Sequence, residues 1–494
     1  MSDLGPLLDE LRERNARAEQ GGGADKVARQ HRLGRWTARE RIAALVDEGS
    51  FEELGRHVLS RHGDASPRLK AAVLPGDGLV CGLGAVNGRT IAVYAHEPTV
   101  LRGSFGHEAS KKLCRLLDLA QERRFPVVAL MDSEGVRVEE GTHAVESFGE
   151  VIGRTIALKG KVPQLTLACG LCVGGAAYTA VLTDCVGMVD GQSFMFVTGD
   201  AVTRTVTGSG ATIDELGGQD VHAKLTGACH AVLADEAAGI AWLKALLAVL
   251  EPKRASSDAV DREVPELESL VPVSPRKPYD MRKVLAAVFD QGSVLELSPT
   301  YGPNLLTAFA RLGGRSVAVV ASQPKEHAGC LDVHASRKGA AFVRWAGELR
   351  LPVVTLVDVP GYLPGKEQEA LGILPHGATL LSAYGNAHVP KVCLVMRKSY
   401  GGASVLSFAA DLRLGLPMAR VDVMGPEGAL QVVLGAEPEG ASPEQQAARA
   451  EAKAQWLARR DSAWAAAETG YLDRIIEPRH VRRELSLALE RLSP

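Results

Sequence analysis

The stretch Val86-Asn-Gly-Arg-Thr-Ile-Ala-Val93 returns 226 residues later as Leu312-Gly-Gly-Arg-Ser-Val-Ala-Val319. The same offset carries residues 103–135 onto residues 329–361 without a gap, with 13 identities in those 33 positions. One residue later in register, the triplet Gly174-Gly-Ala176 falls on Gly401-Gly-Ala403. A stretch that returns in register over such a distance indicates a repeated structural unit. We therefore interpret the chain as a tandem duplication of one domain.

Each copy has the same order of local patterns. An apolar Val/Ile run is followed by a helix-forming segment, a short apolar strand, a second helix, a second apolar strand and the Gly-Gly-Ala turn. Buried strands that alternate with helices predict a largely parallel sheet covered on both faces, and so an α/β fold. The predicted helices cover residues 108–123 and 335–349, and the predicted strands cover 126–131, 164–168, 352–357 and 392–396.

Composition divides the chain into two domains with extensions. A polar, proline-rich stretch from 251 to 278 separates the copies, so we assign residues 1–255 and 279–494 to two domains and 256–278 to a linker. Leu4, Leu7, Leu8 and Leu11 predict one apolar face of an N-terminal helix. Ser442 and the following proline predict the start of a C-terminal helix.

The bulk properties are those of an ordinary globular protein. The 494 residues are 46% apolar and 23% charged, with a formal net charge of −3, which gives no support to a nucleic-acid or anionic-membrane partner. The first residues lack a signal-peptide layout, so we expect a cytoplasmic protein. Residues 162–183 are uncharged and long enough to span a bilayer, but Pro163 and Gly174-Gly175 favour a strand, a turn and a helix instead. We expect no membrane span.

Sequence motifs exclude several kinds of site. The only close cysteine pair is Cys169 and Cys172, and no second pair completes a zinc ribbon, so we expect two buried cysteines and no metal. The histidines form no cluster with ligand spacing. The chain has no Gly-x-Ser-x-Gly, P-loop or His-Glu-x-x-His motif.

The duplicated Gly-Gly-Ala is the sharpest chemical signal. Without a Cβ, a ligand can approach the backbone N–H groups of such a turn, which lie at the positive end of a helix dipole. These donors can stabilise an oxyanion that develops on a carbonyl oxygen. The alternative is that the glycines only allow close packing of strand and helix. The same triplet in both copies favours two oxyanion holes, as carboxyl transfer between biotin and an acyl thioester would require.

The sequence resembles the β subunits of biotin-dependent acyl-CoA carboxylases, of the propionyl-CoA carboxylase type, over nearly its whole length. The resemblance implies tandem crotonase-like (ClpP/crotonase) ββα spiral domains with helical extensions. It also implies a homohexamer in which each active site lies between the N-domain of one subunit and the C-domain of another. The resemblance to this family rests on motifs at residues 21–23, 30–34, 37–42, 215–222, 278–281, 328–332, 358–365 and 397–403.

The resemblance also implies roles for individual residues. Gly402 and Ala403 would donate N–H groups to the thioester enolate, and Gly174 and Gly175 would donate to the biotin oxygen. The biotin enolate can itself take the α-proton in this family, so no side-chain base is expected. The N-terminal half would bind CoA and the C-terminal half would bind biotin and the acyl group. The predicted substrate-binding residues are Glu134, Gly135, Arg137, Gly401 and Val405.

Some positions depart from the family pattern. Glu134 replaces a glycine, Ser404 and Val405 replace a tyrosine and an aspartate, and Leu374-Pro375 replaces Ile-Arg. We expect Glu134 and Val405 to set the substrate range.

No biotin-attachment lysine and no ATP-grasp glycine loop is recognisable. Carboxylation would therefore use biotin on a biotinylated α subunit, which would carry the biotin carboxylase and carrier domains, with an acyl-CoA as substrate and no metal in this chain. Two alternatives stay open: a decarboxylase of a malonyl-type acyl-CoA, and a non-catalytic assembly subunit.

Overall fold

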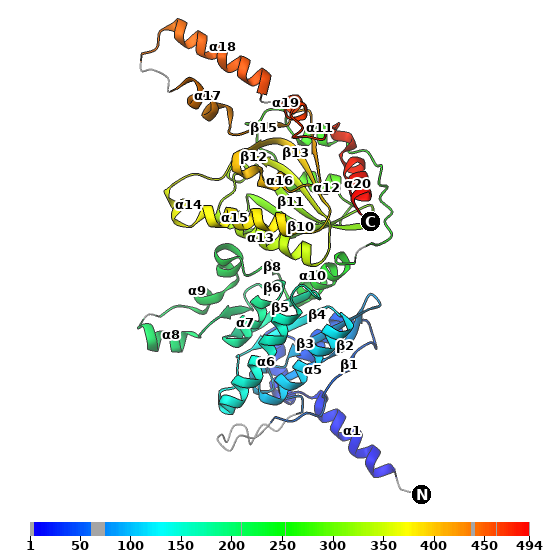
Figure 1. The fold of residues 1–494 in the computed structure, drawn as a ribbon. Coiled ribbons are helices and arrows are strands. Elements are labelled where there is room, and N and C mark those ends of the chain that lie inside the picture. Colours follow the sequence, from blue (N-terminus) through cyan, green and yellow to red (C-terminus); the bar gives the residue numbers. More distant parts are fainter. Residues whose placement is uncertain are drawn as a thin grey trace. The chain divides into compact units, whose positions relative to one another are not determined.

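The computed structural model describes residues 4–60, 75–208, 210–251, 253–435, 440–460 and 462–493. It divides into two compact units, residues 1–248 and 249–494, each built on one eight-stranded mixed sheet (Figure 1). Both sheets carry helices that follow the strands in the same order. The predicted α/β fold with a duplicated architecture is confirmed.

The first unit has the strand order β1-β2-β3-β4-β5-β6-β8, with β7 paired to β5. From β3 onward the neighbours are parallel. Its strands are β1 (Glu52–Glu53), β2 (Leu79–Val86), β3 (Arg89–His96), β4 (Val127–Ser133), β5 (Gln164–Val173), β6 (Cys185–Val189), β7 (Phe194–Phe196) and β8 (Ala231–Leu233). Its α-helices are α1 (Gly5–Glu19), α2 (Ala24–Arg32), α3 (Ala38–Leu45), α5 (His107–Arg123), α6 (Thr142–Leu158), α7 (Gly175–Leu182), α8 (Asp200–Thr207), α9 (Ile213–Gly217) and α10 (Glu236–Val249).

The second unit repeats this topology as β16-β14-β13-β12-β11-β10-β9, with β15 paired to β13. Its strands are β9 (Leu295–Leu297), β10 (Leu305–Leu312), β11 (Arg315–Ser322), β12 (Val353–Val359), β13 (Lys391–Tyr400), β14 (Leu412–Gly415), β15 (Arg420–Asp422) and β16 (Arg474–Ile475). Its α-helices are α11 (Leu267–Leu270), α12 (Met281–Val288), α13 (Val333–Glu348), α14 (Lys366–Ala370), α15 (Ile373–Asn386), α16 (Val405–Phe408), α17 (Pro426–Leu434), α18 (Pro443–Arg460), α19 (Ala463–Glu468) and α20 (Val481–Leu492).

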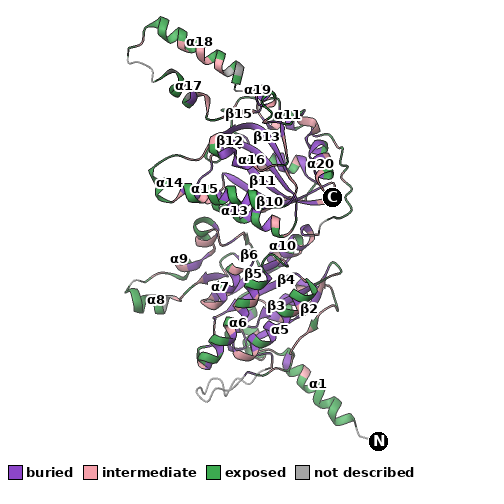
Figure 2. Ribbon diagram, in the orientation of Figure 1, coloured by how far each residue is buried: buried purple, intermediate pink, exposed green. Residues whose placement is uncertain are grey.

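The central strands are buried on both faces. Every residue of β4 and β12 is buried, as expected of parallel strands covered by helices. Figure 2 shows the strands of each unit buried, while α5 and α13 carry exposed residues on their outer faces. The predicted helices and strands agree with these elements to within a few residues at their ends.

The longest strand of each unit bends and changes partner. The first half of β5 pairs with β6 and its second half pairs with β7, with a register shift against β4 between Met131 and Ser133. In the same way, β13 pairs first with β14 and then with β15, and its register against β12 shifts between Val357 and Val359. Each bent strand ends at its Gly-Gly-Ala turn, beyond the main sheet.

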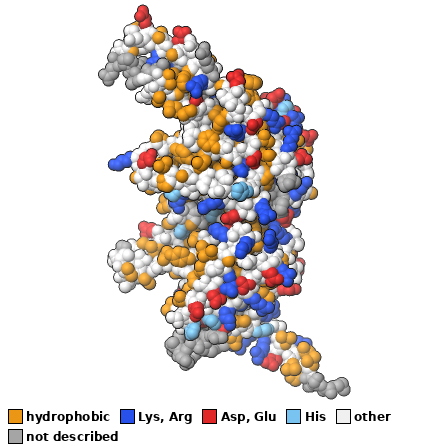
Figure 3. Space-filling model, in the orientation of Figure 1, with side chains coloured by type: hydrophobic (Ala, Val, Ile, Leu, Met, Phe, Trp, Pro, Cys, Tyr) orange, Lys and Arg blue, Asp and Glu red, His pale blue; other side chains and the backbone are white. Residues whose placement is uncertain are grey.

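The segments outside the repeats pack in different ways. Residues 256–278, which the sequence indicates as a linker, belong to the second unit, because Val264, Leu267 and Val271 are fully buried in its core. The apolar face of α1 is exposed: Leu7 is 62% accessible, and apolar side chains lie on its surface in Figure 3. Ser442 caps α18 as predicted, by accepting from the N–H of Gln445.

Residues 162–183 form β5, the glycine turn and α7, as the sequence predicts. Among the described residues, none of the helices is both long and apolar enough to cross a bilayer.

Candidate active site

The first half-site is the turn between β5 and α7. Gly174 has φ +54° and ψ −113°, a conformation that favours glycine. Its N–H donates to the carbonyl oxygen of Phe196 at 2.9 Å, so the chain itself uses the donor that we predict for an oxyanion. This corrects the predicted role of Gly174 as a donor to the biotin oxygen. Its backbone conformation and its hydrogen bond to Phe196 instead form the turn. Gly175 and Ala176 follow in the first turn of α7, where a helix provides no acceptor for its N–H groups.

Gly135 lies directly against this turn. It has φ +90°, and a Cβ on it would fall 2.5 Å from the carbonyl oxygen of Val173 and 3.7 Å from the nitrogen of Gly175. A Cβ on Gly175 would fall 2.7 Å from the Phe148 ring. The structure therefore packs Gly135 against the turn that carries Gly175, in space that a Cβ would not fit without a shift of its neighbours.

The second half-site is the turn between β13 and the 3-10 helix η5 (Gly401–Ser404), which leads into α16. Gly401 has φ +60°, and a Cβ on it would fall 2.9 Å from the carbonyl oxygen of Val423. Gly402 has more room, since a Cβ there would meet only the Tyr362 ring, at 3.6 and 3.8 Å. Burial raises the pKa of Tyr362 to about 12, so its hydroxyl stays protonated at neutral pH.

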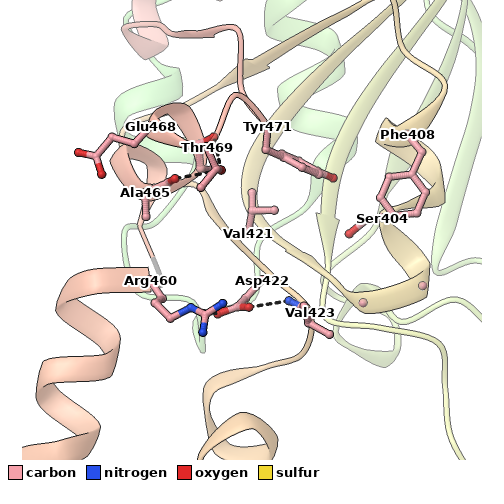
Figure 4. Close-up of a pocket in the computed structure, with 13 residues that line it drawn as sticks. Ser404, Phe408, Val421, Asp422, Val423, Arg460, Ala465, Glu468, Thr469 and Tyr471 are labelled. Atoms are coloured by element: carbon pink, nitrogen blue, oxygen red, sulfur yellow. Dashed lines mark hydrogen bonds and ion pairs between the residues drawn. The ribbon is translucent and has the colours of Figure 1, made fainter.

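A cavity of about 590 Å³ opens beside the second turn (Figure 4). Gly401, Gly402 and Ser404 form one wall, β15 and Val423 form another, and α19 with Tyr471 closes it. Phe408, Val421, Val423 and Ala466 make most of its lining apolar, whereas Asp422 and Arg460 bring charge. The cavity is thus lined mainly by apolar groups with a few polar ones, as small-molecule sites are.

Val405 does not line this cavity. It is only 2% exposed and packs into the second unit, whereas Ser404 and Phe408 on either side of it reach the cavity. The predicted contact between Val405 and the substrate therefore does not arise in this cavity, because the Val405 side chain lies inside the second unit, next to the turn.

Arg137 is also an internal residue. It is 1% exposed, and its Nη1 contacts the carboxylates of Asp77 and Glu140, the latter at 2.7 Å. Nε donates to Ser104 Oγ at 3.1 Å, and Nη2 donates to the carbonyl oxygens of Asp77 and Ser104. All its N–H groups are thus used within the protein. Arg137 therefore supports the turn that carries Gly135, and its prediction as a substrate contact is corrected.

A basic groove of about 580 Å³ adjoins the first half-site. Lys26 and Arg29 of α2, together with Arg35 and Arg102, contribute four cationic side chains to it. Leu171 of β5 and Glu134 also line it, and Gly135, which packs against the first glycine turn, follows Glu134. The groove is thus lined by the residue that directly precedes Gly135 and by Leu171, three positions before Gly174 in the chain. We use the name basic groove for this set of residues.

Glu134 is ion-paired with Arg102 within the basic groove. The Glu134 side chain is 36% exposed and that of Arg102 is 63% exposed, so water reaches the pair. The Glu134 N–H also donates to the carbonyl oxygen of Arg102. Glu134 thus offsets one of the four cations of the groove, next to the first half-site.

The sequence does not single out the basic groove. Lys26 and Arg29 lie three residues apart on α2, so the sequence predicts that both cations are on the same side of this helix. It does not predict which segment of the protein lies opposite them. The structure adds that the start of the chain folds against the end of β4.

Cys169 and Cys172 are fully buried, as predicted. Burial raises the pKa of both thiols, which therefore stay protonated at neutral pH. In the part of the chain that the structure describes, no three His, Cys, Asp or Glu side chains are grouped to hold a metal ion.

The chain is similar to known proteins over nearly its whole length. The carboxyl transferase domain model matches residues 29–493. The propionyl-CoA carboxylase carboxyltransferase subunit of Haloferax mediterranei is 40% identical over 98% of this chain and 96% of its own length. The methylmalonyl-CoA decarboxylase subunit alpha of Propionigenium modestum is 36% identical over 98% of this chain and 95% of its own length.

The same architecture occurs in a crystal structure of transcarboxylase 12S, a hexamer determined with hydrolysed methylmalonyl-CoA bound. It superimposes with a TM-score of 0.94 and 37% identity, covering 99% of this chain and 96% of the other. The tandem crotonase-like fold that the sequence predicts is thereby confirmed. The chain belongs to the carboxyl transferase domain family and is a carboxyltransferase subunit of the acyl-CoA carboxylase type.

Proposed function

We propose that the chain transfers a carboxyl group from carboxybiotin to the α-carbon of an acyl-CoA, with its two glycine turns as oxyanion holes. The observation that carries this proposal is the repetition of the turn. In both units a bent strand ends at a glycine with positive φ, and N–H groups at a helix start follow. Two such turns suit a reaction in which the donor and the acceptor each develop negative charge on a carbonyl oxygen.

The basic groove would bind the phosphate groups of CoA. Lys26, Arg29 and Arg35 supply positive charge, and arginine binds phosphate with paired N–H groups. Glu134 lines the groove and precedes Gly135, which packs against the turn of Gly174 and Gly175. An acyl thioester that leaves the groove beside Glu134 would therefore meet Gly175. We therefore assign the thioester oxygen to the N–H groups of Gly175 and Ala176. This is the reverse of the assignment that the resemblance carries over from the sequence.

The ureido oxygen of biotin would then accept hydrogen bonds from Gly402 and Ala403. The cavity of about 590 Å³ beside this turn has the volume and the apolar lining for a small bicyclic ring. When bound, carboxybiotin supplies the carboxyl group. The chain would orient the ring and stabilise negative charge at the ureido oxygen by N–H donation.

The chain would act as a homohexamer with a biotinylated α subunit as its partner. The two turns belong to different units of the chain, and the similar transcarboxylase 12S forms a hexamer. An active site shared between neighbouring subunits would bring one turn of each kind together. Light scattering of the purified chain tests this: a monomer that retains full transfer activity would contradict it.

A second candidate is the reverse chemistry, decarboxylation of a malonyl-type acyl-CoA. It is favoured by the Propionigenium modestum decarboxylase subunit, which is 36% identical over nearly the full length. The same two oxyanion holes would stabilise the enolates in carboxylation and in decarboxylation.

The decisive experiment uses the full chain without its partner. Malonyl-CoA and methylmalonyl-CoA labelled in the free carboxylate are incubated with the chain, with and without free biotin. We expect label to move to biotin with release of acetyl- or propionyl-CoA. Loss of the carboxylate without biotin would favour the decarboxylase. Failure of every acyl-CoA tested would leave an assembly role, and co-purification with a biotinylated protein would then identify the complex.

A further inference from the structure

The two half-sites differ at one strand position. In the first unit Val173 pairs with Phe196 just before the glycine turn, and in the second unit Tyr400 pairs with Asp422. A carboxylate therefore stands beside the second turn where the first half-site has a phenyl ring. Since the repeat folds with either residue, the fold does not need the carboxylate at this position.

The Asp422 carboxylate is only half satisfied. Its side chain is 10% exposed, and one oxygen, Oδ1, accepts from the N–H of Val423 at 2.7 Å. The other oxygen, Oδ2, is buried and accepts no hydrogen bond from the residues that the structure describes; it forms only a long ion pair, 4.0 Å from the Nε of Arg460 (Figure 4). A buried carboxylate oxygen that accepts no hydrogen bond raises the free energy of the folded protein. A ligand that donates a hydrogen bond to this oxygen would therefore bind more tightly.

The same cavity therefore presents a donor and an acceptor. Gly402 provides a backbone N–H on one wall, and Asp422 provides on another wall a carboxylate oxygen that accepts no hydrogen bond from the described residues. A thioester has a carbonyl oxygen but no N–H group, so it would satisfy only the glycine turn. A cyclic urea has both groups in a rigid ring, and one N–H remains when the other nitrogen carries a carboxyl group.

We propose that Asp422 is a specificity-determining residue of this half-site, which accepts the ureido N–H of the ring whose oxygen binds at Gly402 and Ala403. Asp422 would thereby select biotin over the thioester at the second turn. The inference rests on the proposed function, because it deepens the assignment of the two holes.

Kinetics of the full chain test this inference. The reaction is carboxyl transfer from a malonyl-type CoA to free biotin, measured for wild type, Asp422→Asn and Asp422→Ala. We expect KM for biotin to rise about 10–100-fold in both variants, the range for losing a hydrogen bond to a charged group. The KM for the acyl-CoA should stay within about twofold. A rise in the acyl-CoA KM instead would overturn the inference.

Glu444→Gln is the matched control. It removes one carboxylate charge at an exposed position of α18, outside the cavity. We expect an unchanged KM for biotin in this variant. Arg460→Gln removes the cation that pairs with Asp422 and stacks on Trp456, but keeps the Asp422 carboxylate. If Arg460→Gln reproduces the whole effect of Asp422→Asn, Asp422 acts only by holding α18 and α19, and the inference is wrong.

Equilibrium binding separates this inference from the proposed function. Calorimetry of the full chain compares biotin and dethiobiotin, which keep the ureido group, with lipoic acid, which lacks it. We expect binding of the two ureido compounds only, and its loss in Asp422→Asn. If that pattern holds without any transfer activity, the proposed function fails and the inference stands. No ureido binding, or equal binding of lipoic acid, would overturn the inference.

Discussion

Asp132 and Asp358 occupy equivalent positions at the ends of β4 and β12, and each is paired with an arginine from a different part of the chain. Arg41 of α3 reaches Asp132 at 3.1 Å, whereas Arg397 of β13 reaches Asp358 at 2.7 Å. Gly170 is the counterpart of Arg397 in the first unit, and there the Asp132 carboxylate fills the space of a side chain: a Cβ on Gly170 would fall 2.2 Å from Asp132 Oδ1. The duplication kept the carboxylates and exchanged the source of the positive charge.

Arg41→Met should destabilise the protein strongly. Its removal leaves the carboxylates of Asp132 and Glu236 buried without their common cation. Breaking a buried pair in this way costs about 3–5 kcal/mol. The measurement is the urea midpoint of the full chain. Arg12→Met, which removes an ion pair whose side chains are 74% and 76% exposed, should leave the midpoint unchanged. Equal midpoints for both variants would contradict the assigned role of Arg41.

Gly402→Ala should lower turnover without unfolding the chain. The Cβ would meet only the Tyr362 ring at 3.6 Å, an ordinary contact, but it would stand beside the N–H that receives the ligand oxygen. Alanine keeps the N–H, so the effect comes from the Cβ, which would hold the ligand oxygen away from it; the hydrogen bond lost in this way corresponds to about 10²–10³-fold in kcat. The melting temperature and kcat are compared with those of Gly385→Ala, a change at a glycine of α15 with no atoms nearby. Near-normal kcat in Gly402→Ala would show that the hole lies elsewhere.

Glu134→Gln should tighten the binding of acyl-CoA. The change removes the negative charge that offsets Arg102 in the basic groove. One added net charge near phosphate should lower KM for acyl-CoA about three- to tenfold at low salt, and the difference should shrink as salt rises. Glu146→Gln, at an exposed position of α6 outside the groove, is the control. If KM stays constant, CoA phosphates do not bind there.

Val405→Asp should weaken the second unit. Val405 is 2% exposed, so the new carboxylate would be buried without a partner, which is strongly unfavourable. Burial would raise the pKa of this carboxyl group, and the loss of melting temperature should therefore be smaller at pH 5 than at pH 8. Val405→Ile, which keeps the position apolar, should change the melting temperature less. A stable Val405→Asp with a re-ranked acyl-CoA preference would instead support the substrate contact predicted from the sequence.

Lys338→Met should change the pH dependence of stability. Burial lowers the pKa of Lys338 to about 7, although its Nζ donates to the carbonyl oxygen of Ser298. Between this value and the ordinary 10.5 the unfolded chain binds more protons than the folded one, so the contribution of Lys338 to stability rises with pH. The wild type should therefore gain melting temperature relative to Lys338→Met between pH 7 and 10. A constant difference would show that Lys338 stays charged in the fold.

The sequence predicts the parts of the site that depend on local pattern. Apolar runs bounded by Pro126 or Pro352 identify central strands, and Gly401-Gly402 identifies a turn that needs a glycine. It does not reveal that the carbonyl oxygen of Phe196 accepts a hydrogen bond from the N–H of Gly174, because the two residues are 22 positions apart in the sequence and meet only through the pairing of β5 with β7. The interior position of Arg137 and the basic groove also depend on tertiary contacts that no periodicity encodes.

The packing of residues 256–278 limits how this gene could be divided into two. Arg397 donates to the carbonyl oxygens of Pro272, Ser274 and Lys277, and Val264 lies in the core beneath them. A gene fission after residue 278 would leave residues 256–278 on the N-terminal product, although they pack in the core of the second unit. Arg397, on the C-terminal product, would then lose its three carbonyl acceptors. A viable split would have to fall close to residue 249, before residues 256–278 begin, so that each product carries a complete core.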